Sequence, residues 1–132
     1  MQPALAAGID VFTARSHEST HAYQGAGFGV SHESIDAYTR EQVGNAYMNP
    51  DLLIILAMKD EIERSRRVNN RPESYEADRF ESQDADFQQR IQDYYLEIAR
   101  QKGIEPIDAS TDRLVVQQKM RDQYMQLLFS RA

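Results

Sequence analysis

The apolar residues of this chain fall into short continuous runs and into helical repeats. Residues 8–13 and 51–58 are apolar runs that predict buried strands. The second run is the stronger, because it lacks polar alternation, as is typical of a central strand covered on both faces. Residues 104–107 predict a third, short strand, which Pro106 restricts to a sheet edge or a strand end.

In most of the chain between these runs, apolar residues recur at the three- and four-residue spacing of helices. Helices are predicted over residues 34–48, with Ser31 or Ser34 as N-cap, over 84–102, which Gly103 ends, and over 111–129, with Ser110 or Thr111 as cap. A helix end over residues 2–7, a short charged helix over 60–68 and a polar loop over 69–76 complete the pattern. Strands that alternate with helices predict an α/β fold with a parallel sheet and flanking helices.

Composition narrows the class of function. A chain of 132 residues suffices for one modest domain, and its net charge of −6 disfavours duplex nucleic acid as a partner. A small anionic ligand is compatible with that charge, because a few arginines can bind a phosphate locally. Cysteine is absent, which excludes disulfides and thiolate chemistry within this sequence. With neither a signal segment nor a membrane-length apolar run, we expect a soluble cytoplasmic protein without a membrane partner.

Candidate functional residues are most concentrated in the segment 14–29. Arg15 follows the predicted strand 8–13, so it lies where open α/β sheets collect ligands, and its guanidinium can hold a phosphate bidentately. The alternative for Arg15 is a surface ion pair with Glu18 or Glu33. The glycines at 25, 27 and 29 do not form a phosphate-cradling motif and are expected to serve tight turns and close backbone approach.

Three histidines, His17, His21 and His32, cluster in the sequence and raise the question of a metal. Only His17 and His21 have the i, i+4 spacing, and no carboxylate completes the set that zinc sites favour. We therefore predict no metal site from the sequence.

Several segments together resemble the thymidylate kinases, the P-loop enzymes that phosphorylate thymidine monophosphate (dTMP). They are Ala14 to Gly29, Arg71, Asp78-Arg79-Phe80-Glu81, Phe87, Tyr95 to Ala99, and Ile107-Asp108-Ala109-Ser110. The resemblance covers almost the whole chain and implies a partial P-loop NTPase, or nucleoside monophosphate kinase, fold that lacks its first strands. It implies a single incomplete domain over 1–132, with an acceptor segment at 14–29, a lid at about 66–81 and C-terminal helices over 84–131.

The resemblance also assigns roles to residues. It implies that Arg15 grips the phosphate of dTMP, that Thr20, Tyr23 and Gln24 contact the nucleoside, and that Glu81 lies near the sugar. Tyr23 would leave no space for a 2′-hydroxyl, the alternative being a core aromatic. Arg71 and Arg79 would act as catalytic lid arginines, the alternative being a solvated surface, and Asp108, Ala109 and Ser110 would pack beside the ATP adenine. ATP and Mg²⁺ are the co-substrates that the complete family enzyme uses.

The sequence departs from the family pattern at several positions. Ala14 and Ala57 replace carboxylates, Gln92 stands where an arginine is frequent, and no Walker A motif occurs in these residues. We expect this chain to be the dTMP-binding and lid portion of an enzyme that converts dTMP to dTDP. We expect an N-terminal half to complete it, or a second copy to form a homodimer with it. The alternative is a non-catalytic nucleotide- or partner-binding remnant.

Overall fold

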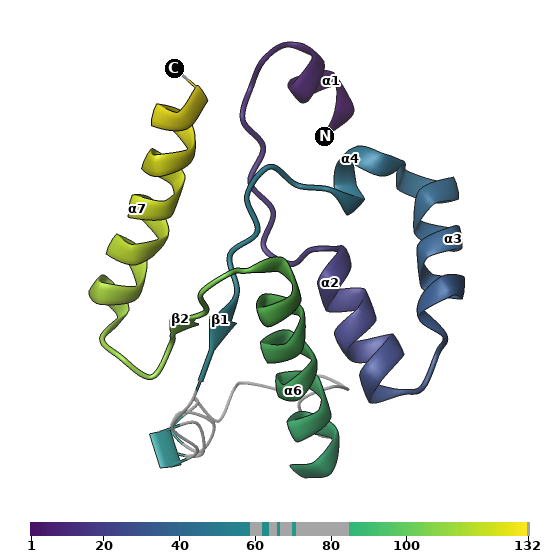
Figure 1. Cartoon of the computed structure of the whole chain (residues 1–132), viewed down its shortest axis with the longest axis vertical. Coiled ribbons are helices and arrows are strands. Elements are labelled where there is room, and N and C mark those ends of the chain that lie inside the picture. The colour runs from purple at the N-terminus through teal and green to yellow at the C-terminus, as the bar shows by residue number, and fades with distance from the viewer. Residues whose placement is uncertain (59–61, 64–65, 67–69, 71–84, 132) are drawn as a thin grey trace. The chain divides into compact units, whose positions relative to one another are not determined.

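A computed structural model describes residues 1–58, 62, 63, 66, 70 and 85–131, in two compact units, Met1–Asp51 and Leu52–Ala132. The elements of the first unit are α1 (Gln2–Ala6), α2 (His17–Thr20), η1 (His21–Gly27), α3 (His32–Val43) and α4 (Asn45–Met48). Those of the second are β1 (Leu56–Ala57), α6 (Ala85–Lys102), β2 (Ile107–Asp108) and α7 (Arg113–Arg131) (Figure 1). That the chain forms one incomplete domain over 1–132 stays a prediction.

In the first unit, α2 and η1 form one continuous helical stretch from His17 to Gly27. Ser16 and Ser19 form a capping box at its start, and its last seven residues adopt the wider π-helical turn. Such turns are rare in proteins, and those that occur are often found at functional sites. The stretch is therefore an unusual local structure in the segment where the sequence places its candidate chemistry.

The predicted helix over 34–48 is two helices. It begins earlier than predicted, at His32, because Ser31 is the N-cap and its hydroxyl accepts a hydrogen bond from the Ser34 amide at 3.2 Å. It is interrupted at Gly44, whose φ of 79° places it in a region that glycine tolerates best, and α4 follows.

The predicted strand over 8–13 does not form a ladder with any part of the chain that the structure describes. The segment is irregular, and Ile9 and Phe12 are 58% and 74% exposed. The physical reason is that a strand is defined by its neighbour: apolar patterning favours extended backbone, but the ladder requires a paired partner.

In the second unit, β1 and β2 pair in parallel, as the sequence predicts for the sheet. The Ile107 amide donates to the Ile55 carbonyl and the Ala109 amide to the Ala57 carbonyl, both at 2.9 Å. The predicted strand 51–58 pairs only at its last residues, and the predicted strand 104–107 is displaced to Ile107–Asp108. The described fold is thus helix-rich, with a small parallel sheet that is consistent with part of a nucleotide kinase fold.

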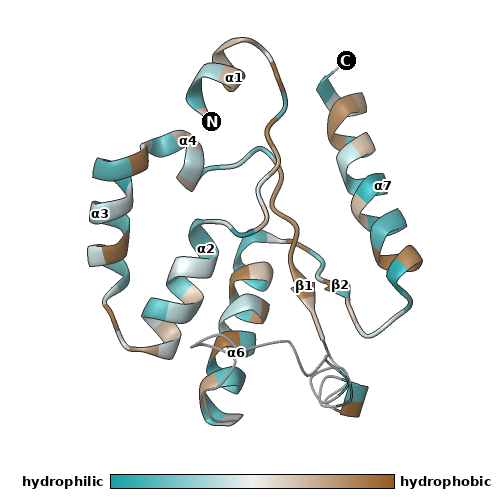
Figure 2. Cartoon of the chain, turned by 180° about the vertical axis from the view of Figure 1, so that it is seen from behind, coloured by the Kyte–Doolittle hydropathy of each residue, from teal (hydrophilic) through white to brown (hydrophobic). Residues whose placement is uncertain are grey.

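The core of the second unit lies between this sheet and α6. Figure 2 shows the apolar character of the chain leading into β1. The buried hydrophobic side chains are Ile55, Ala57, Phe87, Ile91, Ala99 and Ile107. Those of α6 recur at the spacing that predicts an amphipathic helix, and Gly103, with φ of 64°, ends the helix as expected.

The last helix, α7, is capped differently from the prediction. The Asp112 carboxylate accepts from the Leu114 amide at 2.8 Å, so Asp112 is the N-cap rather than Ser110 or Thr111. Among the helices that the structure describes, none is both long and apolar enough to cross a membrane. The predicted short helix over 60–68 and loop over 69–76 fall largely outside the described residues.

Candidate functional site

Arg15 has an unusual backbone. Its φ is 98°, and it is the one non-glycine residue with positive φ among those the structure describes. A residue with a Cβ in this region stores roughly 1–3 kcal/mol of strain, and such residues cluster at binding and catalytic sites. The strain lies at the residue that the sequence singles out for phosphate binding, between the irregular segment 9–13 and α2.

The side chain of Arg15 lies over the aromatic ring of Tyr23, with the guanidinium carbon 5.1 Å from the ring centroid. This distance is within the range of a cation–π contact. Arg15 is exposed and makes no ion pair with a described residue, so the alternative of a pair with Glu18 or Glu33 is not observed there. Glu18 is itself buried. The donors of Arg15 therefore face no carboxylate in the described part of the chain.

The other predicted contacts to the nucleoside lie on the same helical stretch. Thr20 is the last residue of α2, and Tyr23 and Gln24 follow in η1. All three side chains are half-buried, which leaves part of each accessible, so the core-aromatic alternative for Tyr23 holds only in part. The structure thus brings Arg15 and Tyr23 into contact and places Thr20 and Gln24 on the element that carries Tyr23.

In the second unit, the predicted adenine loop follows the carboxyl end of β2. The Ser110 amide and hydroxyl both donate to the Asp108 carboxylate, at 2.9 and 2.5 Å. The Thr111 hydroxyl donates to the Asp108 backbone carbonyl at 2.9 Å, so the turn through Ala109 is fixed by its own side chains. The remaining predicted site residues, Arg71, Arg79 and Glu81, lie outside the described residues.

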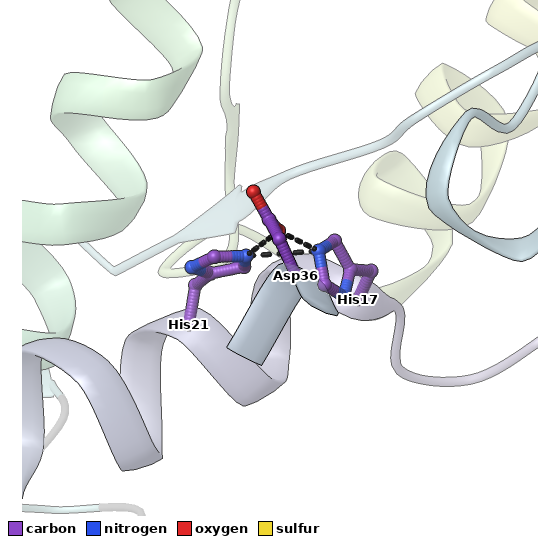
Figure 3. Close-up of side chains that lie close together, drawn as sticks. All are labelled: His17, His21 and Asp36. Carbon is purple, nitrogen blue, oxygen red and sulfur yellow. Dashed lines mark hydrogen bonds and ion pairs between the residues drawn. The ribbon is translucent and has the colours of Figure 1, made fainter. Parts of the chain in front are cut away.

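Two histidines of the acceptor segment and an aspartate of α3 converge (Figure 3). Asp36 Oδ1 lies 2.7 Å from His17 Nε2 and 2.8 Å from His21 Nε2, and the two Nε2 atoms are themselves 2.8 Å apart. His17 and His21 come from one helical stretch, and Asp36 comes from α3. Both histidines are buried, whereas the side chain of Asp36 is 42% exposed. The three groups have the chemistry of a metal-ligand set.

Electrostatics within this cluster favour an ionised Asp36. The hydrogen bond from His17 is the largest influence and lowers the pKa of Asp36, and the bond from His21 lowers it further, against the desolvation that raises it. Asp36 is not predicted from the sequence as part of this cluster, because this carboxylate lies 15 residues beyond His21, on another helix. A short-range spacing rule cannot find a ligand that only the packing of two helices supplies.

His32 extends the cluster. Its Nδ1 lies 2.5 Å from His21 Nδ1, and the two rings are stacked with centroids 4.7 Å apart. Gly25 makes room for this ring: a Cβ at that position would lie 2.7 Å from His32 Cε1. The expectation of close backbone approach at these glycines is met at Gly25, and Gly29 has a positive φ of 78°.

Comparisons with known proteins agree with the family that the sequence resembles. The family model described as thymidylate kinase matches residues 1–128. Similar proteins include the thymidylate kinases of Afipia carboxidovorans, 33% identical over 122 residues, and of Dichelobacter nodosus, 37% identical over 119 residues. These alignments cover 91% and 90% of this chain but 52% and 56% of the relatives, so the chain spans about half the length of the proteins it matches. The chain belongs to the thymidylate kinase family.

Proposed function

We propose that this chain carries the dTMP-binding part of an ATP-dependent dTMP kinase, the enzyme class that converts dTMP to dTDP. The observation that carries the proposal is the strained Arg15, whose guanidinium lies over Tyr23 and faces no carboxylate among the described residues. A positive φ in a non-glycine residue is retained at a free-energy cost, and a phosphate-binding role for that side chain accounts for the cost.

The candidate residues of the acceptor segment would contact different parts of dTMP. Arg15 would hold the dTMP phosphate by charge-assisted hydrogen bonds, because its planar guanidinium matches two phosphate oxygens. The Tyr23 ring, already against Arg15, would pack on the deoxyribose and exclude a 2′-hydroxyl. Thr20 and Gln24 would contact the thymine edge from the same helical stretch, with Glu81 near the sugar.

Phosphoryl transfer would need further groups. Arg71 and Arg79 would stabilise the charge that develops on the transferred phosphoryl group, and Asp108, Ala109 and Ser110 would contact the adenine of ATP. The donor phosphates and Mg²⁺ require a P-loop, and this sequence contains no Walker A motif. We propose that a complementary segment supplies the P-loop and pairs with residues 9–13, which the sequence predicts as a strand and where Ile9 and Phe12 are exposed.

A second candidate is a nucleotide-binding remnant without catalysis. Ala14 and Ala57 favour it, because each replaces a carboxylate that the family resemblance places at this position. This candidate retains the dTMP site and loses phosphoryl transfer.

A reconstitution assay separates the two candidates. The chain would be incubated with dTMP, ATP and Mg²⁺, first alone and then co-expressed with the N-terminal P-loop segment of a full-length thymidylate kinase. The proposal predicts no turnover by the chain alone and dTDP formation in the reconstituted pair, abolished by Arg15→Ala. Assembly of the pair with bound dTMP but without turnover would favour the remnant.

A further inference from the structure

In the cluster of His17, His21 and Asp36, three potential ligand atoms lie within 2.8 Å of one another, and no arrangement of protons satisfies all three contacts while Asp36 is ionised. An ionised carboxylate only accepts hydrogen bonds, so the contacts of Asp36 Oδ1 with His17 Nε2 and His21 Nε2 require a proton on both nitrogens. The third contact, 2.8 Å between these nitrogens, then sets two N–H donors against each other. If either histidine carries its proton on Nδ1 instead, the contact between the two Nε2 atoms becomes a hydrogen bond. The hydrogen bond from that histidine to Asp36 is then lost.

His32 further restricts the protonation of His21, because it contacts the second ring nitrogen of His21, Nδ1. The contact between His21 Nδ1 and His32 Nδ1 requires a proton between them. If His21 Nδ1 donates that proton, a neutral His21 presents the lone pair of Nε2 toward Asp36 and His17. A cation between the three donor atoms would instead attract each of them.

We propose that His17 Nε2, His21 Nε2 and an Asp36 carboxylate oxygen bind a divalent transition-metal ion of the Zn²⁺ type. Two imidazoles and one carboxylate form a ligand set that suits such ions, whereas Mg²⁺ prefers oxygen ligands throughout. A hydrogen bond donated by His21 Nδ1 to His32 Nδ1 would match the outer contact that orients metal-binding histidines.

The geometry needs only a small adjustment. Donor atoms at about 2.0–2.2 Å from a tetrahedral zinc ion lie about 3.3 Å from each other. The three donors are separated by 2.7–2.8 Å, so each pair would open by about half an ångström. Movement of Asp36, whose side chain is 42% exposed, would open its two contacts. The third separation, between the Nε2 atoms of the two buried histidines, would need a small movement of their rings.

The ion would join two elements of the first unit. His17 and His21 lie on the α2–η1 stretch and Asp36 lies on α3, so one ion would fix α3 against the helix that carries Thr20, Tyr23 and Gln24. Three protein ligands leave a fourth position for water on the exposed side of Asp36. The inference rests on this cluster alone and does not depend on the proposed kinase function.

The test is metal titration of the untagged chain. Calorimetry with Zn²⁺ should give one ion per chain, Co²⁺ should show the visible absorption bands of a low-coordinate site, and excess Mg²⁺ should not compete. Asp36→Asn and His21→Gln should each weaken binding by more than tenfold, and His32→Gln by about tenfold through the lost outer contact. Asp122→Asn, an exposed carboxylate change on α7, is the matched control and should leave binding unchanged.

A measurement on the unmodified chain covers the case in which a variant fails to fold. Long-range ¹⁵N NMR of the histidine rings should show His17 and His21 ligating through Nε2, with the proton retained on Nδ1, when one equivalent of Zn²⁺ is added. Absence of Zn²⁺ and Co²⁺ binding would overturn the proposal. Ligation through His32, or through Nδ1 of His17 or His21, would overturn it equally.

Discussion

The guanidinium of Arg15 lies 5.1 Å from the centre of the Tyr23 ring, at a residue whose backbone φ is 98°. A flexible surface arginine has no need of a strained backbone, because an ordinary φ costs nothing and offers the same charge. The contact holds the cation at the start of α2, and the ring that holds it is itself a candidate for the sugar contact. The relationship joins the two residues that we assign to the phosphate and sugar of dTMP.

Replacing Arg15 with Ala should weaken dTMP binding by at least tenfold. The change removes a charge-assisted bidentate contact worth about 1.5–3 kcal/mol. Calorimetric titration of dTMP measures the loss, with Arg40→Ala, an exposed arginine on α3, as the control that keeps the net charge equal. Equal affinities for the two variants would show that Arg15 does not anchor the phosphate.

The backbone strain at Arg15 can be tested by a second substitution. Arg15→Gly and Arg15→Ala both remove the guanidinium, but only glycine adopts a φ of 98° without cost. We expect the Gly variant to have the larger free energy of unfolding, by about 1 kcal/mol. Chemical denaturation of the two variants measures this difference, and a more stable Ala variant would argue against strain at this position.

Tyr23 should determine the choice between deoxyribose and ribose. Tyr23→Ala opens the space that the ring occupies, so the variant should lose much of its preference for dTMP over the ribonucleotide with the same base. Competition titrations with the two nucleotides measure the ratio of affinities. Tyr23→Phe keeps the ring and should keep the preference; a ratio that is equally low in both variants would instead assign the effect to the hydroxyl.

How far the sequence anticipates this structure depends on the range of the interactions involved. The helix α6 is found almost residue for residue, because its apolar spacing and Gly103 are local signals. The strand over 8–13 is predicted but does not form among the described residues, since pairing depends on a distant segment. The Gly44 break is a backbone conformation that residue type does not fix, since glycine also occurs within helices.

In the candidate site too, features with a local sequence signal are predicted, and those that depend on packing or on backbone conformation are not. Arg15, Thr20, Tyr23 and Gln24 are found from a contiguous motif, but neither the φ of Arg15 nor the π-helical turn has a sequence signal. Asp36 joins His17 and His21 only through the packing of α3 against α2 and η1, so spacing along the chain does not reveal it.

Stability should depend on pH through Glu97 on α6. Arg100 and then Gln101 hydrogen-bond its carboxylate and lower its pKa from 4.5 to about 2. Because the folded-state pKa is lowered, the stabilisation is present above the ordinary pKa near 4.5 and is lost as the pH falls toward 2. An NMR titration of Glu97 should give the low pKa, and Arg100→Gln should return it toward 4.5; an unchanged value in that variant would exclude Arg100 as the main cause.

The most direct test of the central claim is calorimetric titration of the unmodified chain with dTMP and, separately, with thymidine. The two ligands differ only in the phosphate, which Arg15 is proposed to hold. We predict one dTMP per chain and at least about tenfold weaker binding of thymidine, the loss expected for one charge-assisted contact. Equal binding of the two ligands, or no binding of dTMP, would contradict the assignment of Arg15 and its segment as an acceptor-phosphate site.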